Sequence, residues 1–221
     1  MFKQLFTALK SGEMLDQAFS QFDEMLDHAQ WMFLRANEVL HRKVAVEDVK
    51  DSILSRDKAI NDLLRSIRRK LVRHLTINPG TDIAASLVLM SVAKDAERIG
   101  DYCKNVFEVG RFYKKEAFHV ARYHDPLEDI CRRVEGLFET VRHSFRESDS
   151  QEAKVALKIA DEIGDGCDDV IEQLLRDEES IQTHEAVAYS LLARHYKRVS
   201  SHLSNVATAV LGKVDELDFR P

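Results

Sequence analysis

The chain has 221 residues and a formal net charge of -6, and glycine and proline are scarce. This acidic balance excludes a general nucleic-acid binder, which needs a basic surface to displace phosphate counterions. The three cysteines are widely spaced and form no CxxC pair, which argues against a disulfide framework and against a structural zinc site. The uncharged run of residues 83–93 is too short to cross a bilayer, and residues 1–13 lack a signal-peptide pattern. The sequence therefore predicts a cytoplasmic protein.

Three long amphipathic helices are predicted in the first half. Apolar residues at alternating spacings of three and four predict the first helix over about residues 15–40. A second is predicted over about 46–75 and ends at "NPGTD", where Thr81 or Asp82 can cap the next helix. The third has an apolar stripe between residues 88 and 107 and extends to about residue 111.

The second half repeats this plan. Asp125 is expected to cap a fourth helix with Pro126 at its first position, where the missing N–H costs nothing. Polar residues 146–152 predict a turn. A fifth helix is predicted to bury Val155, Ile159, Ile163, Cys167, Val170 and Leu174. The sixth buries a stripe over residues 188–210 that includes His195, which we expect to be a hydrogen-bonded core residue rather than a metal ligand.

The third and sixth helices are related in sequence. Residues 94–108 read "KDAERIGDYCKNVFE" and residues 194–208 read "RHYKRVSSHLSNVAT". An offset of one hundred pairs Arg98 with Arg198, Ile99 with Val199, Asn105 with Asn205, Glu97 with Lys197 and Asp101 with Ser201. The repeat predicts an all-α fold of two three-helix bundles, residues 1–115 and 116–221, packed as one unit.

Acidic and amide side chains follow the outer faces of the predicted helices. At about 100° per residue they form one stripe on the third helix, and the second and fifth helices carry pairs at i,i+4 spacing. Carboxylates on neighbouring helices make an oxygen-rich surface suited to divalent cations, whereas a solvated helix face is the simpler alternative. The candidate ligands are Asp57, Asn61, Glu97, Asp101, Asn105 and Glu108, with Asp161 and Asp165 as a weaker set.

These motifs resemble those of the PhoU family of phosphate-signalling proteins. The residues that carry the resemblance are Asp57-x-x-Ile-Asn61, then Glu97-Arg-Ile-Gly-Asp101 followed by Asn105 and Glu108, and in the second half Asp161-x-x-x-Asp165 with Arg198, His202 and Asn205 in register. The resemblance implies two symmetric three-helix bundles. It also implies that the paired acidic motifs bind iron, zinc or another divalent metal on the bundle surface.

The second half departs from the family pattern. Lys197 and Ser201 stand at the two acidic positions of its second motif, and Thr208 stands at the later glutamate position. The Lys197 ammonium is expected among Asp161 and Asp165, where it opposes a bound cation. A specific metal site is therefore expected in the first half only.

A line of arginines follows the second predicted helix, opposite its apolar seam. Arg65, Arg69 and Arg73 are spaced at i,i+4 and therefore share one face. Such a face is either simply solvated or a docking surface for an acidic protein partner. We call these three residues the arginine line.

The resemblance implies a non-enzymatic regulator that contacts a phosphate transporter ATPase or a sensor histidine kinase. Such a regulator would associate with membrane complexes only peripherally and would not bind nucleic acid. Whether it forms a homodimer is left open. One rival is an accessory protein of another ion or phosphate transporter. The other is a carboxylate-bridged metalloenzyme, whose bundles use the Glu-x-x-His motif twice, but Glu38-x-x-His41 lies near the predicted end of its helix.

Overall fold

The computed structural model describes residues 13–113, 120–176 and 181–212. Within these ranges all regular structure is helical, which confirms the all-α prediction. The helices are α2 (Glu13–Leu40), α3 (Val46–Ile77), α4 (Ile83–Phe112), α5 (Ala121–Glu147), α6 (Ser150–Arg176) and α7 (Thr183–Val210). None of these helices combines the length and apolar character needed to span a bilayer.

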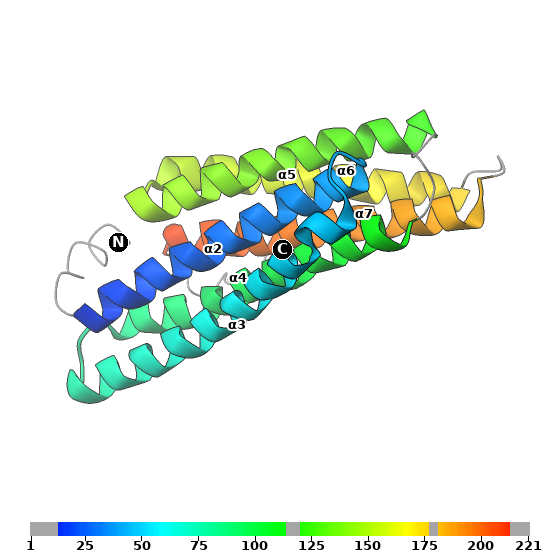
Figure 1. Ribbon diagram of the computed structural model, residues 1–221. Coiled ribbons are helices and arrows are strands. Elements are labelled where there is room, and N and C mark those ends of the chain that lie inside the picture. The colour runs from blue at the N-terminus through cyan, green and yellow to red at the C-terminus, as the bar shows by residue number, and fades with distance from the viewer. Residues whose placement is uncertain (1–12, 114–119, 177–180, 213–221) are drawn as a thin grey trace.

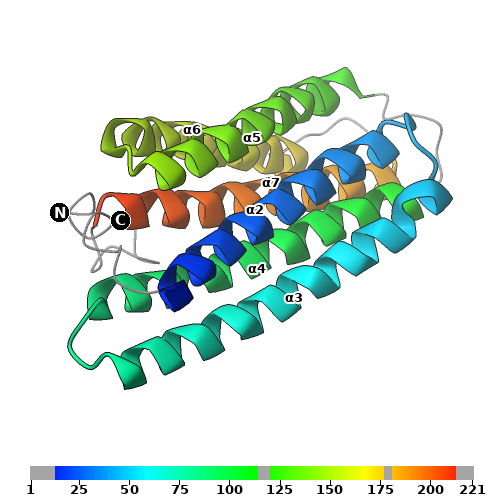
Figure 2. The same ribbon diagram turned by 60° about the vertical axis from the view of Figure 1, so that its left-hand side comes forward.

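The helices form two bundles of three. α2, α3 and α4 pack together, as do α5, α6 and α7, and the bundles meet where α4 packs on α7 and α2 on α5 (Figure 1). Figure 2 shows α3 on one side of the elongated molecule and α5 with α6 on the other, with α2, α4 and α7 between them. The related helices α4 and α7 therefore form the centre of the interface between the bundles. The predicted boundary at residue 115 lies outside the described residues.

The seams of five helices bury the residues that the apolar spacing predicts, apart from the half-buried His195, but α6 differs. Val155 is 53% exposed, and Ile159 and Leu174 are only partly buried. The buried face of α6 instead consists of Ala153, Ala156, Ala160, Ile163, Cys167 and Val170. The predicted stripe advanced mostly by four residues and drifted around the helix, whereas the observed seam alternates three and four.

The start of α5 corrects a second prediction. α5 begins at Ala121 rather than after a cap at Asp125, so Pro126 lies inside the helix. Tyr123 is buried against Tyr189 of α7, with ring centroids 5.6 Å apart. The Tyr189 hydroxyl also accepts a hydrogen bond of 3.3 Å from a backbone N–H just before the helix. These contacts with α7 fix an extra turn of helix, at the cost of the one hydrogen bond that a proline does not donate.

A tight turn joins α3 to α4. Gly80 has a positive φ of 92°, which glycine adopts without steric penalty. Asp82 occupies the predicted N-cap position, but its side chain makes no capping hydrogen bond. Its carboxylate Oδ2 lies 3.1 Å from Nε2 of the buried His74, so it connects the turn to the end of α3.

Candidate functional site

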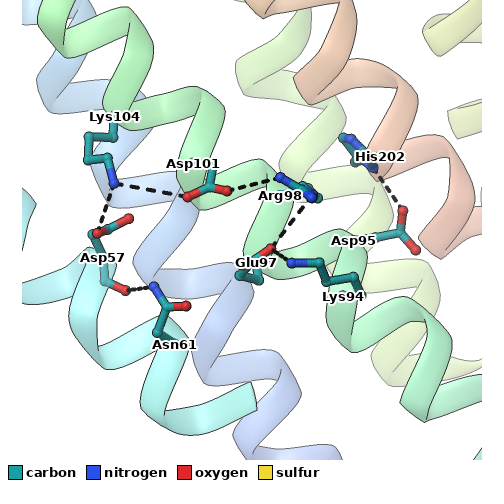
Figure 3. Close-up of polar contacts among 9 residues, drawn as sticks. All are labelled: Asp57, Asn61, Lys94, Asp95, Glu97, Arg98, Asp101, Lys104 and His202. Atoms are coloured by element: carbon teal, nitrogen blue, oxygen red, sulfur yellow. Dashed lines mark hydrogen bonds and ion pairs between the residues drawn. The ribbon is translucent and has the colours of Figure 1, made fainter. Parts of the chain in front are cut away.

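Three of the predicted acids lie across the interface between α3 and α4. Asp57 belongs to α3, and Glu97 and Asp101 lie one turn apart on α4 (Figure 3). The short turn at residues 78–82 makes these helices neighbours and places Asp57 opposite the α4 pair. We call these three residues the acid group. Their side chains are only 18%, 12% and 33% exposed, respectively.

Lys104 on α4 bridges two members of the acid group. Its Nζ lies 3.0 Å from Asp57 Oδ2 and 4.0 Å from Asp101 Oδ1. Burial raises the pKa of Asp101, and the carboxylate of Glu97 raises it further, while the Lys104 ammonium acts in the opposite direction. The ammonium therefore offsets part of the cost of holding these carboxylates together.

Two further cations on α4 occupy the other side of the acid group. Arg98 Nη1 lies 3.4 Å from Asp101 Oδ2, and Arg98 Nε lies 3.9 Å from Glu97 Oε2. Lys94 also pairs with Glu97. Together with Lys104, these side chains place three positive charges beside three carboxylates, as Figure 3 shows. The acid group is thus balanced by three cationic side chains of α4.

This arrangement does not fit a divalent cation. Asn61 Nδ2 donates to the backbone carbonyl of Asp57 at 3.0 Å, so its amide is held against its own helix. The carboxylates that a metal needs are already paired with ammonium and guanidinium groups. Within the described ranges, no three Asp, Glu, His or Cys side chains are placed to share a metal ion. Metal binding here stays a prediction of the sequence, and it requires Lys104 to be displaced.

Asn105 and Glu108 lie one and two turns beyond Asp101 and line a different cleft. This cleft of about 670 Å³ lies between the end of α4 and the start of α7, and its walls are mostly apolar. His195 lines it too, and its buried Nδ1 has no hydrogen-bond partner among the described residues. Burial lowers the pKa of His195. The prediction that His195 is a hydrogen-bonded core residue is therefore wrong for its Nδ1 atom.

The weaker acid pair of the second half lies in a polar cleft between α6 and α7. Asp161 and Asp165 line this cleft of about 550 Å³ together with Lys197 and Ser201. Lys197 is thus near both acids, as the sequence predicts, but it forms its ion pair with Asp168. The cation therefore remains in the cleft while a different carboxylate neutralises it.

A buried carboxylate that the sequence analysis did not single out links the two bundles. Asp95 on α4 is 5% exposed, and its Oδ1 lies 2.9 Å from His202 Nδ1 and 2.8 Å from Asn205 Nδ2, both on α7. The signal was its spacing: Asp95 is three residues after Val92 and four before Ile99, on the apolar side of the helix. An acid at such a position needs partners, and the neighbouring bundle supplies them.

The repeat is visible in this interface as an approximate twofold relation. The offset of one hundred converts the pair Asp95 and His202 into His195 and Tyr102. These two rings also meet across α4 and α7, with centroids 6.0 Å apart. One copy of the contact is thus a hydrogen-bonded carboxylate, and the other is a contact between rings.

The arginine line is exposed along α3, as predicted. Arg65 Nη1 forms an ion pair with Asp62 Oδ1 at 3.1 Å, and both side chains are more than half exposed. Arg69 and Arg73 make no hydrogen bond or ion pair with any residue that the structure describes. Two of the three guanidinium groups are therefore available to a partner.

Glu38-x-x-His41 does not form a paired site. Glu38 contacts Arg35 within α2, and His41 lies just beyond the last residue of that helix. The motif therefore gives no support to the metalloenzyme alternative.

Comparison with known proteins agrees with the fold and the repeat. The family model described as "PhoU domain" matches twice, over residues 22–109 and 127–210. A "Phosphate-specific transport system accessory protein PhoU homolog 1" of Thermotoga maritima is 24% identical over 219 residues, which cover 95% of this chain and 87% of the relative. A homologous accessory protein of Synechocystis sp. is 23% identical over 163 residues, covering 70% and 69% of the two chains.

Two crystal structures share the fold. The phosphate transport system regulatory protein PhoU of Streptococcus pneumoniae superposes with a TM-score of 0.72 at 17% identity, over 92% of this chain and 98% of that chain. PhoU of Pseudomonas aeruginosa superposes with a TM-score of 0.66 at 17% identity, over 96% and 97%. With two matches of the family model that together span most of its length, the chain belongs to the PhoU family.

Proposed function

We propose that this protein is a non-enzymatic regulator of phosphate transport, acting in the cytoplasm through contacts with a transporter ATPase or a sensor histidine kinase. The observation that carries the proposal is the double match to the PhoU domain over both bundles. The accessory role named for the Thermotoga and Synechocystis relatives supports the same reading. Association with the transport system would be peripheral, and a homodimer is compatible with it.

The arginine line is the docking surface in this proposal. Its guanidinium groups are exposed on an otherwise acidic protein, and Arg69 and Arg73 have no partner among the described residues. Guanidinium groups bind carboxylates in a planar, bidentate manner, so the partner surface is expected to be acidic. Electrostatic contacts of this kind mainly raise the association rate and weaken as salt rises.

We expect Arg65→Ser/Arg69→Ser/Arg73→Ser to reduce partner capture at least several-fold without destabilising the fold. Exposed charges usually change the free energy of unfolding by less than about 0.5 kcal/mol, so the melting temperature should stay nearly unchanged. The measurement is purification of the tagged full-length chain from its native host, with the bound proteins identified by mass spectrometry. A matched control is Arg132→Ser/Lys158→Ser/Arg176→Ser, which removes three exposed charges from the second bundle.

The outcomes separate the alternatives. Capture of a phosphate transporter ATPase or a sensor kinase, lost in the first variant and kept in the second, supports the proposal. Capture of components of a different ion transporter would favour the rival accessory role. Equal capture by both variants would remove the arginine line from the proposal, and a large loss of stability would mean that these arginines hold the fold together.

The acid group and its cations lead to a separate prediction about metal. Because Lys104 lies between Asp57 and Asp101, we expect Lys104→Met to increase the affinity for iron, zinc or manganese at least tenfold. The measurement is metal analysis of gently purified protein together with titration of each metal. Adding Glu97→Gln/Asp101→Asn to this variant should abolish the gain, whereas adding Asp161→Asn/Asp165→Asn should not.

Metal bound by the wild-type protein would contradict this expectation. Stoichiometric metal in the wild type that is lost in Glu97→Gln/Asp101→Asn would mean that a divalent ion displaces the Lys104 ammonium and binds the acid group directly. The ion pairs in Figure 3 would then describe only the metal-free protein.

A further inference from the structure

The end of the α3–α4 hairpin exposes several large apolar side chains. Val72 and Ile77 on α3 are 59% and 56% exposed, and Ile83 and Leu87 on α4 are 48% and 55% exposed. These four residues, which we call the hairpin end, flank the turn at one end of the elongated molecule (Figure 2). They account for four of the ten large exposed apolar residues in the described ranges, within sixteen positions of sequence. Scattered exposed apolar residues are ordinary, but a group of this kind marks an interaction surface.

The same part of the chain is strongly basic. Residues 63–94 contain six lysines and arginines and a single acid, although the whole chain has a net charge of -6. That acid is Asp82, whose side chain is only 10% exposed and faces His74. Arg65 and Lys94 pair with Asp62 and Glu97 just outside the segment, but the arginines between them, Arg68, Arg69 and Arg73, have no acidic partner among the described residues.

Three arginines form one surface with the two hairpin-end residues of α3. Arg68, Arg69 and Arg73 surround Val72 and line a groove of about 620 Å³ along α3 that ends at Ile77. All three are exposed, and none has a hydrogen bond or ion pair with a described residue. Free guanidinium groups thus lie one to two turns from the exposed aliphatic end of the hairpin.

The short run 83–93 adjoins this surface on α4, because Ile83, Leu87 and Ser91 share one helix face at i,i+4 spacing and Ser91 lines a second cleft with Arg68. It contains no charged residue, so Ile83 and Leu87 lie on an uncharged face before Lys94. Lys94 and Arg98 line the same cleft, but both pair with carboxylates of the acid group, so the unpaired positive charge is that of the α3 arginines. The hairpin therefore has an aliphatic end and a basic collar.

We propose that the hairpin end inserts into the headgroup region of an anionic lipid bilayer, with Arg68, Arg69 and Arg73 binding the lipid phosphates. Aliphatic side chains gain by leaving water at the boundary of the acyl chains, and basic residues beside them are attracted to anionic headgroups. Guanidinium groups match phosphate oxygens bidentately, which suits this collar of arginines. None of the described helices is able to span a bilayer, so the contact is confined to the interface.

The observations favour lipid over an acidic protein helix as the occupant. The apolar residues lie at the end of a hairpin rather than in a groove between helices, and an end that protrudes reaches a flat interface readily. An amphipathic partner helix is normally received by an apolar groove with walls on both sides. The 620 Å³ groove has α3 residues as its only described lining.

The test uses the full chain and lipid vesicles, without any protein partner. Arg69 and Arg73 also belong to the arginine line, so vesicle binding decides the lipid proposal and partner capture decides the regulatory one. Co-sedimentation is measured with phosphatidylcholine vesicles and with mixed phosphatidylcholine and phosphatidylglycerol vesicles at low and high salt. We expect binding only to the anionic vesicles, weakening with salt. Val72→Ser/Ile77→Ser/Ile83→Ser/Leu87→Ser should weaken binding more than tenfold, and each arginine replaced by serine should weaken it roughly fivefold.

A matched control removes exposed apolar residues elsewhere. Leu54→Ser/Val155→Ser/Leu175→Ser/Val187→Ser changes four residues that are 47%, 53%, 82% and 53% exposed, and it should bind vesicles like the wild type. Circular dichroism and thermal melts establish that both variants are folded. The proposal is overturned if anionic vesicles are not bound, if the control loses as much binding as the hairpin variant, or if the chain binds an acidic amphipathic peptide and no vesicle.

Discussion

Replacement of Ile99 by aspartate is expected to abolish the cooperative folded state, because it destabilises the protein by about 4 kcal/mol or more. Ile99 is 0% exposed in the middle of α4, the helix that packs against α2, α3 and α7. A carboxylate at position 99 loses its hydration and gains no hydrogen-bond partner. Protonation of the buried carboxyl group lowers this free-energy cost but does not remove it. The loss approaches the total stability of an ordinary domain, which is about 5–15 kcal/mol.

Two variants separate charge burial from loss of volume in this experiment. Ile99→Val removes one methyl group and should cost about 1 kcal/mol. Leu175→Asp places the same charge at a position that is 82% exposed, and should change stability by less than about 0.5 kcal/mol. Urea unfolding followed by circular dichroism measures all three. A cooperative transition for Ile99→Asp close to that of the wild type would mean that α4 is not the centre of the core.

Asp95→Ala is expected to produce the second largest loss, about 2–4 kcal/mol. Asp95 is buried at the interface between the bundles, and its removal deletes the carboxylate that His202 Nδ1 and Asn205 Nδ2 contact. Far-UV circular dichroism reports all the helices, while fluorescence of Trp31, the single tryptophan, reports the first bundle. Urea unfolding monitored by both probes gives the loss of stability.

A double-mutant cycle assigns this loss to the contact itself. If the carboxylate acts through His202, Asp95→Ala should cost much less in a His202→Ala background than in the wild type. Asp95→Asn keeps the shape of the side chain and removes only its charge, so it should cost less than Asp95→Ala. Additive losses in the cycle would indicate that Asp95 stabilises α4 alone rather than the contact between bundles.

The acid group shows where sequence reasoning succeeded and where it stopped. The i,i+4 spacing of Glu97 and Asp101 is a local property of a helix, so the sequence was sufficient to place both on one face. Lys104, in contrast, follows Asp101 by three residues but also reaches Asp57 on α3. That second contact depends on the distance and rotation between two helices, which no local pattern contains.

The predictions of where α5 starts and of which residues α6 buries were wrong for related reasons. Asp125 and Pro126 are strong local signals for a helix start, but the packing of Tyr123 on Tyr189 outweighed them. In α6, alanines form much of the buried seam, and alanine is common on both buried and exposed faces of helices. The apolar spacing therefore predicted that Val155 is buried, although the neighbouring helices pack on the face of α6 that carries Ala153 and Ala156.

The sequence by itself determined the all-α class, the six helices of the described residues and the repeat that relates α4 to α7, because helical periodicity and internal similarity are properties of the residue order. Only the tertiary structure decided which charges meet: Lys104 with Asp57, Lys197 with Asp168, and Asp95 with His202. Each of these pairs joins two helices. Its existence depends on how the helices pack, and packing is set by the whole core rather than by the spacing of the residues that form the pair.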